Sequence, residues 1–133
     1  MRVVQAADAI EPDWALCQGE AQQAFGNPAL YVQRLFPRAR HIEVQVLSDG
    51  SGAVSHLWER ECSLQRQRQK LVEIAPLPAP GLHPAVRQRL LDAALAMARA
   101  VRYRNLGTFE FLVDATQAGP EAGFAFIAAN ARL

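Results

Sequence analysis

The seven residues from His41 to Leu47 alternate between polar and apolar side chains. This period of two is typical of a β-strand with one buried face, and its polar side would carry His41, Glu43 and Gln45. Residues 48–52, which read SDGSG, tolerate a positive φ and precede a second apolar-rich run, Val54 to Trp58. The segment therefore predicts a β-hairpin and restricts the chain to folds that contain an antiparallel sheet.

The rest of the chain adds helices and a second hairpin. Apolar side chains recur at helical spacing from Pro12 to Phe25 and from Pro84 to Val101, where they form a wide stripe. Strand patterns span 108–113 and 124–129, and the proline-rich stretch 75–81 cannot continue a sheet. Half the residues are apolar, enough for a core. We predict an α+β fold, a mainly antiparallel sheet with flanking helices.

Composition excludes several classes of protein. The 133 residues fit one domain, and 14 basic against 13 acidic side chains predict no nucleic-acid-binding surface. No apolar run approaches the ~20 residues of a membrane span, and only two cysteines favour a cytoplasmic location. Both ends stop at or near apolar runs, so we expect a piece of a longer protein. Its exposed sheet edges would favour a homo-oligomer.

The polar side of the first hairpin has two interpretations. Antiparallel sheets usually expose one polar face to solvent, and His41, Glu43 and Gln45 would suit that face. The same residues would suit a binding site if another element covered them. The sequence leaves both interpretations open.

A second polar run, from Gln65 to Lys70, contains the only lysine of the chain. If the run is extended, Arg66, Arg68 and Lys70 point to one side. Three cations on one strand face would suit an anion such as phosphate, bicarbonate or a protein carboxylate. A charged edge that prevents aggregation explains the same pattern.

The last hairpin places an acid among aromatic side chains. Glu110 stands between Phe109 and Phe111, where burying a carboxylate is costly unless it is paired or metal-bound. Glu110 and Asn130 offer the oxygen ligands that magnesium takes. One carboxylate alone makes a minimal site for this metal.

Four segments together resemble one enzyme family. They are 40–47 (RHIEVQVL), 59–70 (ERECSLQRQRQK), 107–112 (GTFEFL) and 126–133 (FIAANARL). They are similar to the "RHIEVQVL", "ERDCS-x-QRR-x-QK", "GTFEFL" and "FIE-x-N-x-R-x" segments of biotin carboxylase, a domain of the ATP-grasp group. Their order and spacing match over essentially the whole chain.

The resemblance implies a place in a larger enzyme. Residues 1–36 would be the end of the ATP-grasp lid subdomain and its hinge, and 37–133 the central and C-terminal part of the sheet. The reaction would be the ATP- and bicarbonate-dependent carboxylation of biotin. It would require Mg²⁺ or Mn²⁺, a biotin carrier domain and the rest of the carboxylase chain, so the chain alone is expected to be inactive.

The resemblance also implies roles for individual residues. Lys70 and Arg132 would face bicarbonate and the carboxyphosphate made from it, as catalytic residues. Glu110 and Asn130 would hold the metal. The residues expected to bind the nucleotide are Arg34, Phe36, His41, Gln65 and Arg68.

One departure from the family keeps other functions open. The family's second metal carboxylate should stand at Ala128, where alanine offers no ligand. A different ATP-grasp ligase, similar to carbamoyl-phosphate synthase, is one alternative. A non-catalytic ATP-grasp remnant that serves assembly or nucleotide sensing is another.

Overall fold

The structure is a computed structural model that describes residues 2–67, 69–78 and 81–131. It contains two compact units, Met1–Leu35 and the chain from Phe36 onward. The first unit consists of a short 3₁₀ helix, η1 (Ala7–Ala9), and helix α1 (Ile10–Phe25). Gly26 ends α1 with a φ of 68°, a left-handed conformation that glycine adopts without strain. No residue of α1 is buried, and the assignment of this unit to a lid and hinge stays a prediction.

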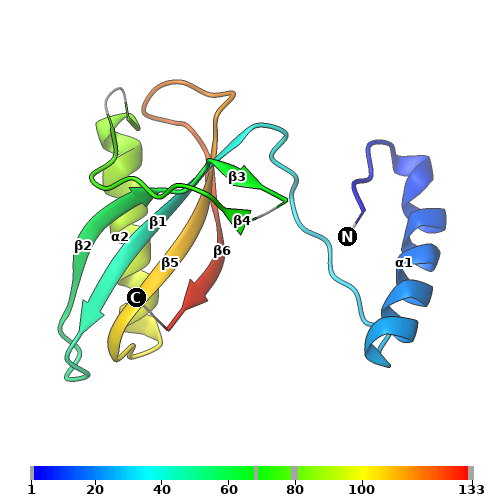
Figure 1. Cartoon of the computed structure of the whole chain (residues 1–133), viewed down its shortest axis with the longest axis horizontal. Helices are drawn as coiled ribbons and strands as arrows, with labels where there is room; N and C mark the ends of the chain where they lie inside the picture. Colours follow the sequence, from blue (N-terminus) through cyan, green and yellow to red (C-terminus); the bar gives the residue numbers. More distant parts are fainter. Residues whose placement is uncertain (1, 68, 79–80, 132–133) are drawn as a thin grey trace. The chain divides into compact units, whose positions relative to one another are not determined.

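The second unit is built on a four-stranded antiparallel sheet in the order β2-β1-β5-β6 (Figure 1). The strands are β1 (Ala39–Ser48), β2 (Val54–Glu61), β5 (Asn105–Asp114) and β6 (Phe124–Asn130). Both predicted hairpins are present, and the α+β class is confirmed. Each strand extends beyond its predicted bounds, because polar positions at the strand ends also pair with a neighbour.

Helix α2 (Pro84–Ala100) packs on one face of this sheet (Figure 1). Pro84 occupies the first turn, and the His83 ring accepts a hydrogen bond from the Ala85 amide. The apolar stripe of α2 meets the apolar side of β1 and β5, where each large side chain contributes about 1.5–3 kcal/mol on burial. Val101, which the stripe predicted as buried, is exposed because the helix ends before it.

The polar run after β2 is not the single extended strand that we considered. It forms a small hairpin of β3 (Gln65–Arg66) and β4 (Gln69–Lys70), with Gln67 at a φ of 50° between them. Gln65 pairs with Lys70, so these two side chains share a face and Arg66 lies on the other. The expected cationic face of Arg66 and Lys70 is therefore wrong, and Arg68 lies outside the described residues.

The segment that follows this hairpin is mostly irregular. Among residues 71–78, only Ile74 pairs with the sheet, through an isolated bridge to Glu61. No helix in the described part of the chain is long and apolar enough to cross a membrane.

Strand register collects polar residues on the face opposite α2. Glu43 of β1 lies directly opposite Glu110 of β5, and Glu110 lies opposite Ala128 of β6. Thr108 is paired in the same way with Asn130. Because direct partners share a face, four strands and the β3–β4 hairpin bring their polar side chains together there.

Candidate functional site

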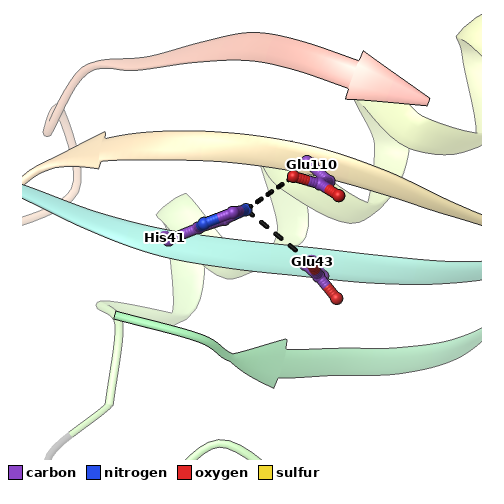
Figure 2. Close-up of side chains that lie close together, drawn as sticks. All are labelled: His41, Glu43 and Glu110. Atoms are coloured by element: carbon purple, nitrogen blue, oxygen red, sulfur yellow. Dashed lines mark ion pairs between the residues drawn. The ribbon is translucent and has the colours of Figure 1, made fainter. Parts of the chain in front are cut away.

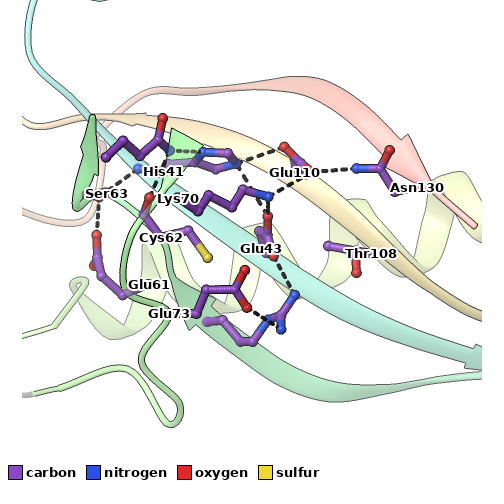
Figure 3. Close-up of polar contacts among 12 residues, drawn as sticks. His41, Glu43, Glu61, Cys62, Ser63, Lys70, Glu73, Thr108, Glu110 and Asn130 are labelled. Atoms are coloured by element: carbon purple, nitrogen blue, oxygen red, sulfur yellow. Dashed lines mark hydrogen bonds and ion pairs between the residues drawn. The ribbon is translucent and has the colours of Figure 1, made fainter. Parts of the chain in front are cut away.

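A small polar pocket lies on this face of the sheet (Figure 3). Its walls come from β1, β2, β4, β5, β6 and the segment after β4, and its residues are Glu43, Arg60, Lys70, Glu73, Thr108, Glu110 and Asn130. His41, Glu43 and Glu110 are buried. The interpretation of the polar face as solvent-facing is therefore wrong for His41 and Glu43, because the β3–β4 hairpin and β2 side chains cover them.

Glu43 is the most enclosed acid of the site, with no exposed surface. Its Oε1 forms an ion pair with the Lys70 ammonium, and its Oε2 accepts a hydrogen bond from Arg60 Nη2 at 2.7 Å. Burial alone would raise the pKa of Glu43, but the hydrogen bonds and charges of Lys70 and Arg60 outweigh burial and lower it. Glu43 is therefore held as a carboxylate.

Glu110 receives contacts from three sides. Lys70 Nζ lies 3.1 Å from its Oε1, which also accepts a hydrogen bond from the Asn130 amide. His41 Nε2 lies 2.9 Å from Oε2 of Glu110 and 3.7 Å from Oε1 of Glu43 (Figure 2). The His41 contact has the distance of an ion pair but not the direction of a hydrogen bond, so His41 Nε2 has no hydrogen-bond partner among the described residues.

The other nitrogen of His41 is fixed by the hairpin. Gln65 Nε2 lies 2.7 Å from His41 Nδ1 and also donates to the Cys62 carbonyl at 2.8 Å. With the amide nitrogen donating, His41 Nδ1 is the acceptor and Nε2 carries the proton of the neutral ring. This tautomer places an N–H group at Nε2, the buried ring nitrogen that lies beside Glu110.

Lys70 lies between two carboxylates. Desolvation would lower the pKa of Lys70, but its hydrogen bonds to Glu43 and Glu110 outweigh desolvation and raise it. Arg60 continues the network to Glu73, with Nη1 lying 2.5 Å from Oε2. The described walls thus hold three carboxylates and two cations in one connected network.

Glu110 and Asn130 offer a set of donors that fits a magnesium ion whose other ligands are phosphate oxygens. Glu110 would supply one carboxylate and Asn130 one amide oxygen, and magnesium in nucleotide sites takes one or two carboxylates plus phosphates and water. Oxygen or nitrogen atoms of His41, Glu43 and Glu110 all lie within 4.8 Å of one another. Ala128, directly opposite Glu110, adds no ligand.

Five of the predicted site residues meet in this network: His41, Gln65, Lys70, Glu110 and Asn130. Of the other predicted residues, Phe36 is buried in the second unit and Arg34 is exposed in the first. Arg68 and Arg132 lie outside the described residues. The roles of all of these residues stay predictions.

The sequence did not single out the acid at the centre. The alternating pattern identifies Glu43 only as a member of the polar strand face, and no local pattern assigns Arg60 or Glu73 to a site. Alternation along the strand places Glu43 on the same face as His41, and this shared face is a local signal for the site. The pairing of β1 with β5, which sets Glu43 opposite Glu110, joins segments far apart in the chain and has no local signature.

The family model described as "Carbamoyl-phosphate synthase L chain, ATP binding domain" matches residues 1–133. Pyruvate carboxylase 1 of Caenorhabditis elegans is 47% identical over 133 residues, all of this chain and 11% of that protein. Pyruvate carboxylase of Staphylococcus aureus is 41% identical over the same share of each chain. The chain thus spans about a tenth of the length of these curated relatives.

The chain also matches solved structures of biotin carboxylases. The biotin carboxylase–β,γ-ATP complex of Campylobacter jejuni matches with a TM-score of 0.81 and 42% identity, covering 100% of this chain and 28% of that one. The biotin carboxylase domain of a thermophilic 2-oxoglutarate carboxylase bound to bicarbonate matches with a TM-score of 0.82 and 35% identity, covering 99% and 28%. The predicted ATP-grasp architecture is confirmed by these matches.

Proposed function

The chain belongs to the family of carbamoyl-phosphate synthase L chain ATP-binding domains, and we propose that it serves as part of a biotin carboxylase. The reaction is the ATP- and bicarbonate-dependent carboxylation of biotin carried by a separate domain, in the cytoplasm. One observation carries the proposal: a single polar pocket is lined by Glu43, Lys70, Glu110 and Asn130, and His41 lies 2.9 Å from its Glu110. The relatives are pyruvate carboxylases and biotin carboxylases, which favours this activity over carbamoyl phosphate synthesis.

Each residue has a chemical task in this proposal. Glu110 and Asn130 would hold Mg²⁺ or Mn²⁺, which would neutralise phosphate charge during phosphoryl transfer. His41, with its Nε2–H directed into the site, donates to a phosphate oxygen of the nucleotide. Arg34 and Phe36 contribute to the adenine end, and Gln65 and Arg68 to the ribose and phosphates.

Lys70 and Arg132 would act on the bicarbonate side. A lysine ammonium presents a compact charge with three donors, which suits a small oxyanion such as bicarbonate or carboxyphosphate. Positive groups directed at such an intermediate stabilise its negative charge during transfer of the carboxyl group. Glu43 keeps Lys70 charged and holds it in the pocket.

The proposal is tested by exchange into an active enzyme. The matching segment of the Campylobacter jejuni biotin carboxylase is replaced by these 133 residues, with and without Ala128→Glu. We expect bicarbonate- and biotin-dependent ADP release from the Ala128→Glu chimera. The chimera that keeps Ala128 lacks the second carboxylate, so its rate should be lower by a factor of about 100 or more. Glu110→Gln in the active chimera is the matched control and should abolish the activity.

Ala128 also supports a second candidate, a non-catalytic ATP-grasp domain. Its Cβ stands opposite Glu110, where a second carboxylate would complete the metal site. If the Ala128→Glu chimera folds, binds ATP and still releases no ADP, the non-catalytic function is correct and the carboxylase proposal is wrong. Bicarbonate-dependent ADP release from the 133-residue chain alone would instead contradict the expectation that it is inactive by itself.

A further inference from the structure

Two buried carboxylates stand face to face in the sheet. Glu43 and Glu110 are direct partners across β1 and β5 and lie on the same face. Like charges directly opposite each other destabilise an antiparallel pair. Burial strengthens the repulsion because water no longer screens the charges. The fold therefore needs a cation between these two residues.

Lys70 supplies that cation. Its ammonium forms ion pairs with Oε1 of Glu43 and with Oε1 of Glu110, the latter at 3.1 Å (Figure 3). It reaches this position from the β3–β4 hairpin, whose Gln65 is anchored to the Cys62 carbonyl. A divalent cation held by Glu110 would compete with the Lys70 ammonium for the same carboxylate, since both need to lie within ion-pair distance of it.

The remaining contacts allow the exchange. Glu43 retains Arg60 at Oε2 when Lys70 moves, so its charge stays paired. Lys70 pairs with Oε1 of Glu110, whereas His41 Nε2 lies beside Oε2 of the same carboxylate. Neither carboxylate is therefore left without a positive or polar neighbour when the ammonium leaves Glu110.

We propose that Lys70 is an exchangeable counter-ion: a divalent cation at Glu110 displaces its ammonium, which then becomes available to a small oxyanion in the same pocket. This inference rests on the proposed function, in which the oxyanion is bicarbonate. Without the metal, Lys70 is held by two carboxylates and the pocket repels anions. Because such coupling is reciprocal, the oxyanion increases metal affinity by the factor by which the metal increases oxyanion affinity.

The composition of the chain makes the exchange measurable. Lys70 carries the only ε-amine, so brief acetylation of the purified protein labels Lys70 and the N-terminal amine, and mass spectrometry separates the two peptides. We expect saturating Mn²⁺ alone to increase Lys70 labelling about 5- to 10-fold, within the range typical of coupled sites. The N-terminal amine should not change, and Glu110→Gln should abolish the effect of Mn²⁺.

Metal affinity gives an independent measurement. By electron paramagnetic resonance of free Mn²⁺, we expect Lys70→Gln to bind the ion about 5- to 10-fold more tightly than the parent, because the competing charge is gone. Lys70→Arg, which keeps a cation, should not gain affinity.

Two results would overturn the inference: Mn²⁺ leaving Lys70 labelling unchanged, or Lys70→Gln binding Mn²⁺ more weakly than the parent. Both measurements use Mn²⁺ without nucleotide, bicarbonate or biotin. If Mn²⁺ displaces Lys70 in these measurements but the Ala128→Glu chimera is inactive, the carboxylase proposal is refuted and the cation exchange stands.

Discussion

Cys62 lies inside the site network without being suited to act as a nucleophile or base. Its side chain has no exposed surface, and burial, followed by the negative charges of Glu43 and Glu73, raises the pKa of the Cys62 thiol to about 12. The thiolate is the reactive form of cysteine, so a thiol held this way is inert near neutral pH. Cys62 therefore packs beneath the ion pairs as a small apolar side chain.

This predicts a pH dependence of folding. The thiol of the unfolded chain ionises near pH 9, whereas the folded thiol keeps its proton until about pH 12. The contribution of Cys62 is fully present below pH 9 and is lost as pH rises, because only the unfolded state releases the proton. We expect the free energy of unfolding to fall by at most about 1.4 kcal/mol per pH unit above pH 9 from this group.

Urea denaturation between pH 8 and pH 10.5 measures the effect. Cys62→Ala should flatten the alkaline fall. Equal slopes in the parent and Cys62→Ala would show that the Cys62 thiol ionises alike in both states.

Single residues of the site were predictable where a local pattern or a motif marked them. Glu110 between two phenylalanines was conspicuous because a carboxylate in that setting needs a partner. Glu43 was not, because the same alternation describes a solvated strand face and only the cover supplied by Lys70 and Arg60 distinguishes the two. Cover of this kind comes from residues distant in the chain, so local periodicity does not reveal it.

At the scale of elements, the two main hairpins and α2 followed from periodicity, turn residues and Pro84. The β3–β4 hairpin did not, because its turn depends on Gln67 adopting a positive φ, which is uncommon outside glycine, asparagine and aspartate. Because of this turn, Lys70 lies on the side of Gln65 and not on the side of Arg66, where a single extended strand would place it.

The beginning of β5 depends on a glycine for a steric reason. A Cβ at Gly107 would overlap the Tyr103 hydroxyl, which donates to the Leu106 carbonyl at 3.2 Å. The Tyr103 ring also packs edge-on against Phe109, with ring centroids 5.5 Å apart. The missing side chain of Gly107 thus lets the chain after α2 close tightly onto the sheet.

We predict that Gly107→Ala lowers the free energy of unfolding by about 1–3 kcal/mol, because the tyrosine ring must move out of its packed position. Tyr103→Ala in the same protein should remove part of that loss, with a coupling energy of about 0.5–3 kcal/mol between the two positions. Urea denaturation followed by circular dichroism measures each term.

The matched control is Gly123→Ala, whose Cβ would have only Gln117 Oε1 nearby, at 4.0 Å. It should change stability by no more than about 0.5 kcal/mol. If the changes at Gly107 and Tyr103 add without coupling, the close approach of the ring does not explain the glycine.

At the scale of the whole molecule, stability is concentrated in the second unit. Every residue of the hydrophobic core cluster lies between Ile42 and Ala122, on β1, β5, α2 or the loop before β6. Helix α1 contributes no buried side chain, although Trp14 and Phe25 are among its residues. The site network is likewise built from residues of the second unit alone.

We therefore predict that a chain of residues 36–133 folds without residues 1–35. Its thermal midpoint should lie within about 4 °C of the midpoint of the 133-residue chain, since a change of 1 kcal/mol shifts a domain of this size by about 4–8 °C. An isolated helix the length of α1 is marginal in water, so residues 1–35 alone should show little helical signal by circular dichroism.

Phe111→Ala in the 36–133 chain is the control that shows whether the thermal transition reports unfolding of the hydrophobic core. Phe111 has no exposed surface and packs against Phe124 and Phe126, so its loss should cost about 3–5 kcal/mol and lower the midpoint sharply. Persistence of the Mn²⁺ effect on Lys70 labelling in the shortened chain would place the whole cation exchange within the second unit. A shortened chain without a cooperative transition would mean that residues 1–35 are needed for the core to form, although every residue of the core cluster belongs to the second unit.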